Sequence, residues 1–317
     1  MRGAPIGVFD SGVGGLTVLK ALVAELPREH FVYLGDTARL PYGTKSPETV
    51  ARYAVQAAEA LSEYGVKCLV IACNTASSVG LPAIREHISG VPIIGVIEPG
   101  AEAACAASKS GHIAVIATEG TVRGGAYQEA ILRLRGRASV VAQPAQLFVA
   151  LAEEGLYEGP IAESIARHYL DPLFHPSSAS AHAVHTHAAP ARTASARPST
   201  AFPTSTGEAA NGHPLPDTPD VPDTPNAPDT LVLGCTHFPM LASAIRAAVG
   251  PSITIVDSAA TTAKAVRDTL DREGLTREEG EGATRFLATD SVERFARIGS
   301  RFLQRPIDPE EVELVDL

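Results

Sequence analysis

Short apolar runs alternate with stretches of helical spacing along most of the chain. The apolar runs are bounded by turn-type residues, a pattern typical of strands buried on both faces of a parallel sheet. Strands are expected near residues 5–9, 31–34, 67–72, 91–96, 113–116, 139–141, 231–234, 253–256 and 285–288. Helices are expected over residues 16–26, from 46 onward, and over 101–108, 124–134, 147–154, 161–170, 240–249, 259–270 and 292–302. This alternation predicts an α/β fold.

Two of the apolar runs end in a cysteine that is followed by polar residues. One run leads into Cys73-Asn74-Thr75, and the other leads into Cys235-Thr236-His237. Asp10 precedes Cys73 by nearly the same number of positions as Thr118 precedes Cys235, once residues 175–229 are left out. The repeat predicts two similar parallel-sheet α/β domains that face each other across a central cleft. Because ligands bind beyond the carboxyl ends of such strands, each domain would present one cysteine to that cleft.

The expected first domain comprises residues 1–96 and 260–317, and the second comprises residues 97–259. Residues 175–229 interrupt the second domain, with ten of the chain's 24 prolines and Phe202 as the single aromatic residue. Such a composition buries too little apolar surface to offset the entropy of ordering, and it predicts a disordered insertion. Its histidines His182, His185 and His187 are interpreted as solvated side chains, and no metal site is predicted.

Composition and charge narrow the classes of partner. The chain has 317 residues, of which 45% are hydrophobic, and a formal net charge of -10, which argues against nucleic acid as a partner. No apolar run is long enough to span a bilayer, so no membrane partner is expected. The stretch after Met1 does not resemble a signal peptide, so the expected compartment is the cytoplasm. A small-molecule substrate is expected, and the oligomeric state is left open, with a homodimer as one alternative.

The four cysteines divide into two kinds. Cys68 and Cys105 lie within a strand pattern and a helix pattern, and they are interpreted as small core residues. Cys73 and Cys235 each end a strand, and a thiol has an unperturbed pKa of about 8.5, so thiol and thiolate forms can coexist near neutral pH. That combination suits a two-base reaction at opposite faces of one carbon atom. Asp10 is the candidate partner of Cys73, and His237 is the candidate partner of Cys235.

Four segments in order resemble bacterial glutamate racemases of the aspartate/glutamate racemase family. They are residues 6–15 (IGVFDSGVGG), 35–43 (GDTARLPYG), 72–76 (ACNTA) and 234–239 (GCTHFP). The resemblance covers nearly the whole chain apart from residues 175–229. It implies an isomerase that needs no cofactor, interconverts L- and D-glutamate, and supplies D-glutamate for peptidoglycan of the cell wall.

The resemblance also implies roles for individual residues. Cys73 would exchange a proton with D-glutamate and Cys235 with L-glutamate, with Asp10, His237 and Glu153 as further catalytic residues. The implied substrate-binding residues are Asp10, Ser11, Tyr42, Gly43, Asn74, Thr75, Thr121, Thr236 and His237. The sequence departs from the family's usual pattern in its proline-rich insertion and in Gln143, which stands where many relatives have another cysteine.

Three alternatives stay open at the level of sequence. A racemase of another acidic amino acid, such as aspartate, would share the two-cysteine chemistry and differ in its side-chain pocket. A pyridoxal-phosphate racemase would need a Schiff-base lysine, and Lys45 is the sole lysine in a candidate site loop. A non-catalytic, two-lobed protein would bind the amino acid without exchanging its α-proton.

The insertion generates the first testable prediction. Replacing residues 176–228 with a short Gly/Ser linker should leave the melting temperature and the racemase activity close to those of the intact chain. The reason is that the free energy of loop closure changes slowly with loop length. Thermal unfolding followed by circular dichroism, together with a racemisation assay, measures both quantities. A large loss of stability would contradict the interpretation of residues 175–229 as an insertion without packed structure.

Overall fold

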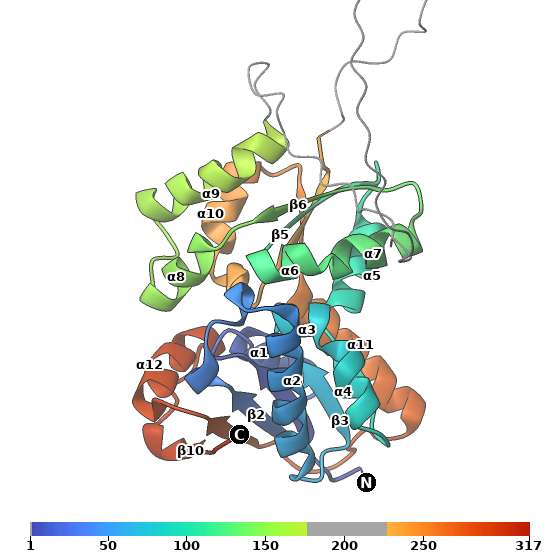
Figure 1. The fold of residues 1–317 in the computed structure, drawn as a ribbon, viewed down its shortest axis with the longest axis vertical. Coiled ribbons are helices and arrows are strands. Elements are labelled where there is room, and N and C mark those ends of the chain that lie inside the picture. Colours follow the sequence, from blue (N-terminus) through green and yellow to red (C-terminus); the bar gives the residue numbers. More distant parts are fainter. Residues whose placement is uncertain (1, 176–226) are drawn as a thin grey trace, which may run out of the picture. The chain divides into compact units, whose positions relative to one another are not determined.

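The computed structural model describes residues 2–175 and 227–317, which form two parallel β-sheets with helices on both faces of each (Figure 1). Sheet A has the strand order β10-β9-β2-β1-β3-β4, and sheet B has the order β6-β5-β7-β8. The strands of sheet A are β1 (Ile6–Asp10), β2 (Phe31–Gly35), β3 (Cys68–Ile71), β4 (Ile93–Gly95), β9 (Thr284–Ala288) and β10 (Val312–Leu314). The strands of sheet B are β5 (His112–Ala117), β6 (Ser139–Pro144), β7 (Thr230–Gly234) and β8 (Thr254–Asp257).

The strand order confirms the predicted α/β fold and its internal repeat. In sheet A, β1 pairs with β2 on one side and with β3 on the other, and β4 lies beyond β3. In sheet B, β5 pairs with β6 and β7 in the same way, and β8 lies beyond β7. The strands that precede Asp10 and Cys73 therefore correspond to those that precede Thr118 and Cys235. Strands β9 and β10 occur in sheet A alone.

Helices cover both faces of each sheet. Around sheet A lie α1 (Leu16–Glu25), α2 (Pro47–Ser62), α3 (Asn74–Val79), α4 (Leu81–His87), α11 (Ser258–Glu273) and α12 (Val292–Leu303). Around sheet B lie α5 (Ile97–Ala107), α6 (Glu119–Gly124), α7 (Ala126–Leu134), α8 (Leu147–Glu154), α9 (Pro160–Phe174) and α10 (Ala242–Val249). Short 3-10 turns span Thr37–Arg39 (η1), Tyr42–Thr44 (η2), Phe238–Leu241 (η3) and Pro309–Glu311 (η4). In Figure 1, α2 lies in front of β2 and β3.

The central strands are apolar throughout because both of their faces are buried. Successive side chains of a strand point to opposite faces, so Ile6 and Val8 of β1 pack in one cluster with Leu16 and Leu19 of α1. Phe9 packs on the other face, in a cluster with side chains of α2. The first cluster continues into sheet B, where it includes residues of β5 and β7. One hydrophobic cluster therefore joins the two sheets.

The secondary-structure predictions were wrong at several boundaries, for local reasons. A helix was expected to begin at residue 124, but α6 already begins at Glu119, because the hydroxyl of Thr118 accepts a hydrogen bond from the N–H of Thr121 and caps the helix. A helix was also expected to begin at residue 101, but residues 98–100 already lie in the first turn of α5. Pro99 is tolerated there because the first N–H groups of a helix have no partner within the helix. Helices α3 and α4 and strand β10 were not predicted.

Residues 176–226 of the predicted insertion lie outside the described residues, as do His182, His185 and His187. The last predicted residue of the insertion, Asp229, is part of the folded chain. Its carboxylate accepts hydrogen bonds from the Ser108 hydroxyl at 2.6 Å and from the Ser110 N–H at 2.7 Å. Among the described residues, none of the helices has the length and apolar character that crossing a membrane requires.

A buried ion pair closes the amino-terminal end of sheet A. The Lys67 ammonium lies 2.6 Å from the Glu29 carboxylate, and both side chains are 1% exposed. The ammonium also donates hydrogen bonds to the carbonyls of Arg2 at 2.7 Å and Leu275 at 2.8 Å. The Glu29 carboxylate in turn accepts a hydrogen bond from the Arg277 N–H at 2.8 Å. The pair therefore ties together four segments that are distant in sequence.

Removing one partner of this ion pair should be costly. Lys67→Met leaves the Glu29 carboxylate buried without a counter-charge, so we expect the free energy of unfolding to fall by about 3–5 kcal/mol. The double variant Lys67→Met/Glu29→Leu removes both charges and should recover much of that loss. Urea denaturation of the three proteins measures the difference. A single variant as stable as the wild type would show that the pair contributes nothing to stability.

Candidate active site

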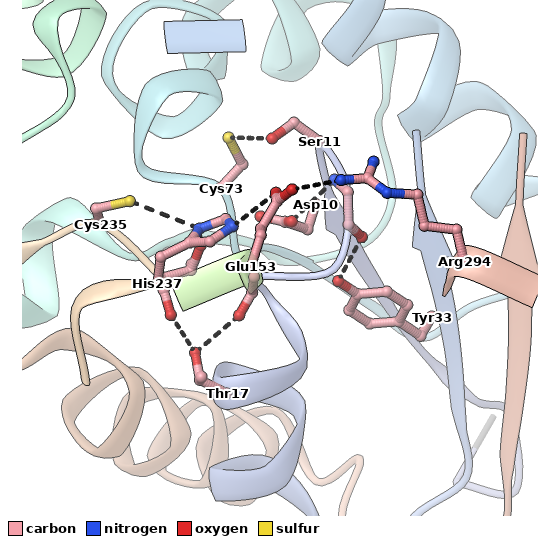
Figure 2. Close-up of polar contacts among 12 residues, drawn as sticks. Asp10, Ser11, Thr17, Tyr33, Cys73, Glu153, Cys235, His237 and Arg294 are labelled. Atoms are coloured by element: carbon pink, nitrogen blue, oxygen red, sulfur yellow. Dashed lines mark hydrogen bonds and ion pairs between the residues drawn. The ribbon is translucent and has the colours of Figure 1, made fainter. Parts of the chain in front are cut away.

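Cys73 and Cys235 lie at corresponding places in the two sheets. Cys73 follows β3 and Cys235 follows β7, each just beyond the carboxyl end of its strand, and each residue is 5% exposed. Figure 2 shows the two sulfur atoms in one group with Asp10 and His237. The structure thus brings together the two cysteines and the acid–base partner that the sequence predicted for each.

The Cys73 thiol has hydrogen-bonding partners, but no cation lies beside it in the part of the chain that the structure describes. Its sulfur caps α3, accepting from the Ala76 N–H at 3.5 Å, and lies 3.5 Å from the Ser11 hydroxyl. Burial, followed by the nearby Asp10 carboxylate, raises the pKa of Cys73 to about 12, although the hydrogen bonds with Ser11 and Ala76 act to lower it. At neutral pH, Cys73 is therefore a neutral thiol, which is able to deliver a proton.

Asp10 ends β1 and is buried. One carboxylate oxygen, Oδ2, accepts a hydrogen bond from the Gly12 N–H at 2.9 Å, whereas Oδ1 has no hydrogen-bond partner among the described residues. Burial raises the pKa of Asp10, and the positive charge of His237 and the N–H groups of Gly15 and Gly12 oppose that rise. A buried oxygen without a partner incurs a desolvation penalty, which a bound donor can relieve.

The glycine-rich loop after β1 allows the two halves of the site to approach closely. A side chain at Gly14 would overlap the ring of His237 and the hydroxyl of Thr236. The Thr17 hydroxyl, one helical turn further, lies 2.9 Å from the carbonyl oxygens of both Gly14 and Thr236. The glycines are therefore needed for contact between the Asp10 loop and the Cys235 loop.

Cys235 is the first member of a chain of alternating polar partners. Its sulfur lies 3.8 Å from Nδ1 of His237, and Nε2 of His237 lies 3.3 Å from Oε1 of Glu153. The second carboxylate oxygen of Glu153 accepts a hydrogen bond of 2.8 Å from Arg294. Burial acts to lower the pKa of His237, but the hydrogen bonds to Cys235 and Glu153, together with the charge of Asp10, raise this pKa to about 10. A cation therefore stands beside Cys235.

A cluster of buried hydroxyls joins α3 to α6. The Thr75 hydroxyl lies 2.9 Å from that of Thr118 and 3.3 Å from that of Thr121, and the hydroxyls of Thr118 and Thr121 are 2.9 Å apart. Each hydroxyl is both donor and acceptor. The cluster can therefore rearrange its hydrogen bonds to offer donors to a carboxylate.

Asn74 adds a second polar group from α3. Its Oδ1 accepts a hydrogen bond of 2.9 Å from the Tyr127 hydroxyl, while its Nδ2 is buried without a hydrogen-bond partner in the described part of the chain. The Tyr127 contact therefore fixes which end of the amide is engaged and leaves the two N–H donors available.

The Tyr42 side chain is used for packing. The residue is 1% exposed, and its hydroxyl donates a hydrogen bond to the carboxylate of Asp36. The neighbouring Gly43 lies against Thr118, where a side chain would contact the threonine Cβ at 2.9 Å. The predicted contact of Tyr42 and Gly43 with the substrate therefore concerns their backbone N–H groups, and it stays a prediction.

Some residues of this site were missed in the sequence. Thr118 could have been identified from the internal repeat, because it occupies the place in the second half that Asp10 occupies in the first. Nothing in the sequence distinguishes Tyr127 or Arg294 as a site residue, because each lies in a stretch of ordinary helical spacing. Thr17 also lies within the first predicted helix, so its contact with the Cys235 loop could not be inferred.

Comparison with known proteins agrees with this architecture. A model of the family described as Asp/Glu/hydantoin racemase matches residues 6–167. The chain belongs to this racemase family, which makes it an isomerase. It is 41% identical over 299 residues to a glutamate racemase of Geobacter metallireducens, and the match covers 94% of this chain and 92% of the relative.

Solved structures of glutamate racemases have the same fold. The enzyme of Francisella tularensis in complex with D-glutamate superimposes with a TM-score of 0.79 at 30% identity, covering 100% of this chain and 98% of that one. The enzyme of Thermus thermophilus in complex with β-chloro-D-alanine superimposes with a TM-score of 0.75 at 39% identity, with the same coverage of both chains.

The raised pKa of His237 generates a prediction about stability. The pKa of the His237 imidazole is about 10 in the folded state and about 6.5 in the unfolded state. The contribution of His237 to the free energy of unfolding is therefore complete below pH 6.5 and declines as the pH rises toward 10. The free energy of unfolding should therefore fall between pH 6.5 and pH 9. Urea denaturation across this range should give a flatter pH dependence for His237→Asn than for the wild type. Equal slopes for the two proteins would contradict the assignment.

Proposed function

We propose that this protein is a glutamate racemase that interconverts L- and D-glutamate without a cofactor, supplying D-glutamate for peptidoglycan. The observation that carries the proposal is the pair of buried cysteines at the carboxyl ends of β3 and β7, each with its own acid–base partner. The relatives named as glutamate racemases, and the D-glutamate complex of one of them, support the choice of substrate. The four free cysteines of the chain favour the reducing cytoplasm as its compartment.

In the direction from L- to D-glutamate, Cys235 is the base. The cationic His237 beside it stabilises the thiolate, which removes the α-proton as the Cα–H bond breaks. The electron pair of that bond delocalises into the α-carboxylate. The Cys73 thiol then gives its proton to the opposite face of Cα, so the product is D-glutamate, with Cys235 protonated and Cys73 ionised.

The reverse reaction exchanges these roles. The Cys73 thiolate removes the α-proton of D-glutamate, and the Cys235 thiol protonates the other face. Because burial raises the pKa of Cys73, a thiolate there is a strong base. Asp10 is the catalytic partner of Cys73 in this proposal, because its carboxylate acts electrostatically on the thiol and its own pKa is raised by burial.

The substrate's charged groups match the polar atoms around the cysteines. Oδ1 of Asp10, which has no partner among the described residues, suits the substrate ammonium, with Ser11 beside it. Nδ2 of Asn74 and the threonine hydroxyls suit the carboxylates. The predicted carboxylate donors are the side chains of Asn74, Thr75, Thr121 and Thr236 and the backbone N–H groups of Tyr42 and Gly43. Aspartate is one methylene shorter, and it should be a poorer substrate because it cannot fill both sets of donors at once.

Conversion in deuterated water tests the proposal. L-glutamate alone should yield D-glutamate that carries deuterium at Cα from the first turnover, because the proton is delivered by a second base that has exchanged with solvent. Cys73→Ala and Cys235→Ala should each lower racemisation by at least about 100-fold, since each removes a positioned acid–base group. Proton NMR and chiral chromatography measure exchange and racemisation separately.

Cys105→Ala is the matched control, because Cys105 lies on α5 with its sulfur directed at the Ile131 carbonyl, away from the site. It should racemise glutamate at the rate of the intact protein. Binding of glutamate without loss of the α-proton would indicate a non-catalytic binding protein instead. Faster conversion of aspartate than of glutamate would reassign the substrate.

A further inference from the structure

Glu153 is held from two sides by groups that come from different parts of the fold. Its Oε1 lies 3.3 Å from Nε2 of His237, and its Oε2 accepts a hydrogen bond of 2.8 Å from Nη2 of Arg294 (Figure 2). Glu153 and His237 belong to the sheet B side of the molecule, whereas Arg294 lies on α12, which packs on sheet A. The Arg294 contact therefore reaches across to a carboxylate that touches a residue of the active site.

The exposure of the two partners differs. The Arg294 side chain is 47% exposed and that of Glu153 is 17% exposed. An ion pair with one exposed member adds little to stability, because solvent screens the charges and two long side chains lose freedom. The ion pair therefore acts mainly on the orientation of its less exposed member, Glu153, whose other carboxylate oxygen lies against the imidazole of His237.

We propose that Arg294 is a positioning residue for the proton transfer at Cys235. By holding Oε2, the guanidinium turns Oε1 toward His237 and keeps the imidazole directed at the Cys235 sulfur 3.8 Å away. The inference rests on the function proposed above. Arg294 does not contact the reacting atoms in this account, and it acts through Glu153 and His237.

The charges along this line alternate, which supports the assignment. The guanidinium is positive, the Glu153 carboxylate negative and the His237 imidazolium positive, and a Cys235 thiolate completes the series. Hydrogen bonding to His237 and the charge of Arg294 both lower the pKa of Glu153, so it stays ionised. Cys73 has no equivalent series, since its partners are Ser11, the Ala76 N–H and the Asp10 carboxylate.

Substitution of Arg294 tests the inference on the intact chain. Arg294→Gln should lower kcat/KM for glutamate by about 10- to 100-fold, the loss that follows when a catalytic group shifts by about 1 Å. The loss should fall on kcat, with KM within about threefold of the wild type, because no contact with the substrate is removed. The loss in kcat/KM should be equal in both directions, because the equilibrium constant between the enantiomers is one and equals the ratio of the two kcat/KM values. Arg294→Lys retains a cation and should recover most of the rate.

Two further variants distinguish a positioning role of Arg294 from a general loss of folded structure. Arg297→Gln changes an exposed arginine three residues later on α12, which forms no ion pair with the rest of the described chain, and it should match the wild type. In a Glu153→Gln background, Arg294→Gln should cost no further activity, because the group through which it acts has already changed. The thermal unfolding midpoints of the Arg294 variants should equal that of Arg297→Gln.

A wild-type kcat for Arg294→Gln, or a full additional loss in the Glu153→Gln background, would overturn the inference. Either result leaves the proposed function intact as long as the wild-type protein racemises glutamate and the two cysteine variants do not. Absence of racemisation in the wild-type protein would instead remove the proposed function itself.

Discussion

The site depends on the free-energy cost of ionising a thiol that is buried away from water. Burial alone raises the pKa of a thiol, and the structure offsets this cost differently on the two sides. Cys235 lies beside an imidazolium, whereas Cys73 lies beside a carboxylate and a hydroxyl. The two sulfurs therefore have opposite electrostatic surroundings before any substrate is considered, although the strands that present them are related by the repeat. The repeat sets where the two thiols lie, and their neighbours set the charge beside each one.

Contact between the two sheets is as much a part of the site as the cysteines. Gly14 lies against Thr236 and His237, Thr17 reaches the Thr236 carbonyl, and Thr75 reaches Thr118. The hydrophobic core that runs from β1 into β5 and β7 holds these loops in register. A change far from the sulfurs that loosened this core would therefore disturb the relative placement of acid and base.

Much of this arrangement could be predicted from the sequence. The strand pattern and the repeated spacing placed Cys73 and Cys235 at matching strand ends. The helix expected from residue 46 onward is α2, and the Ser46 hydroxyl accepts a hydrogen bond from the Thr49 N–H at its start. Side chains that reach the site from helices could not be predicted, because Tyr127 and Arg294 fit the spacing of ordinary helical residues. Strand β10 was not predicted, because two of its three residues, Glu313 and Leu314, are exposed and do not show the apolar pattern of a buried strand. Glu153 was identified through the family resemblance alone.

The hydroxyl cluster of Thr75, Thr118 and Thr121 has a consequence for turnover. Its members hydrogen bond to one another, so a carboxylate that binds there must compete with bonds that already exist. A guanidinium in the same place would hold the anion far more tightly through charge-assisted bonds. An enzyme that must release either of two mirror-image products gains nothing from tight retention, because the slow step would become escape of the product. Under the binding mode proposed above, neutral donors would keep the residence time of both enantiomers short and leave the rate to the chemistry at Cα.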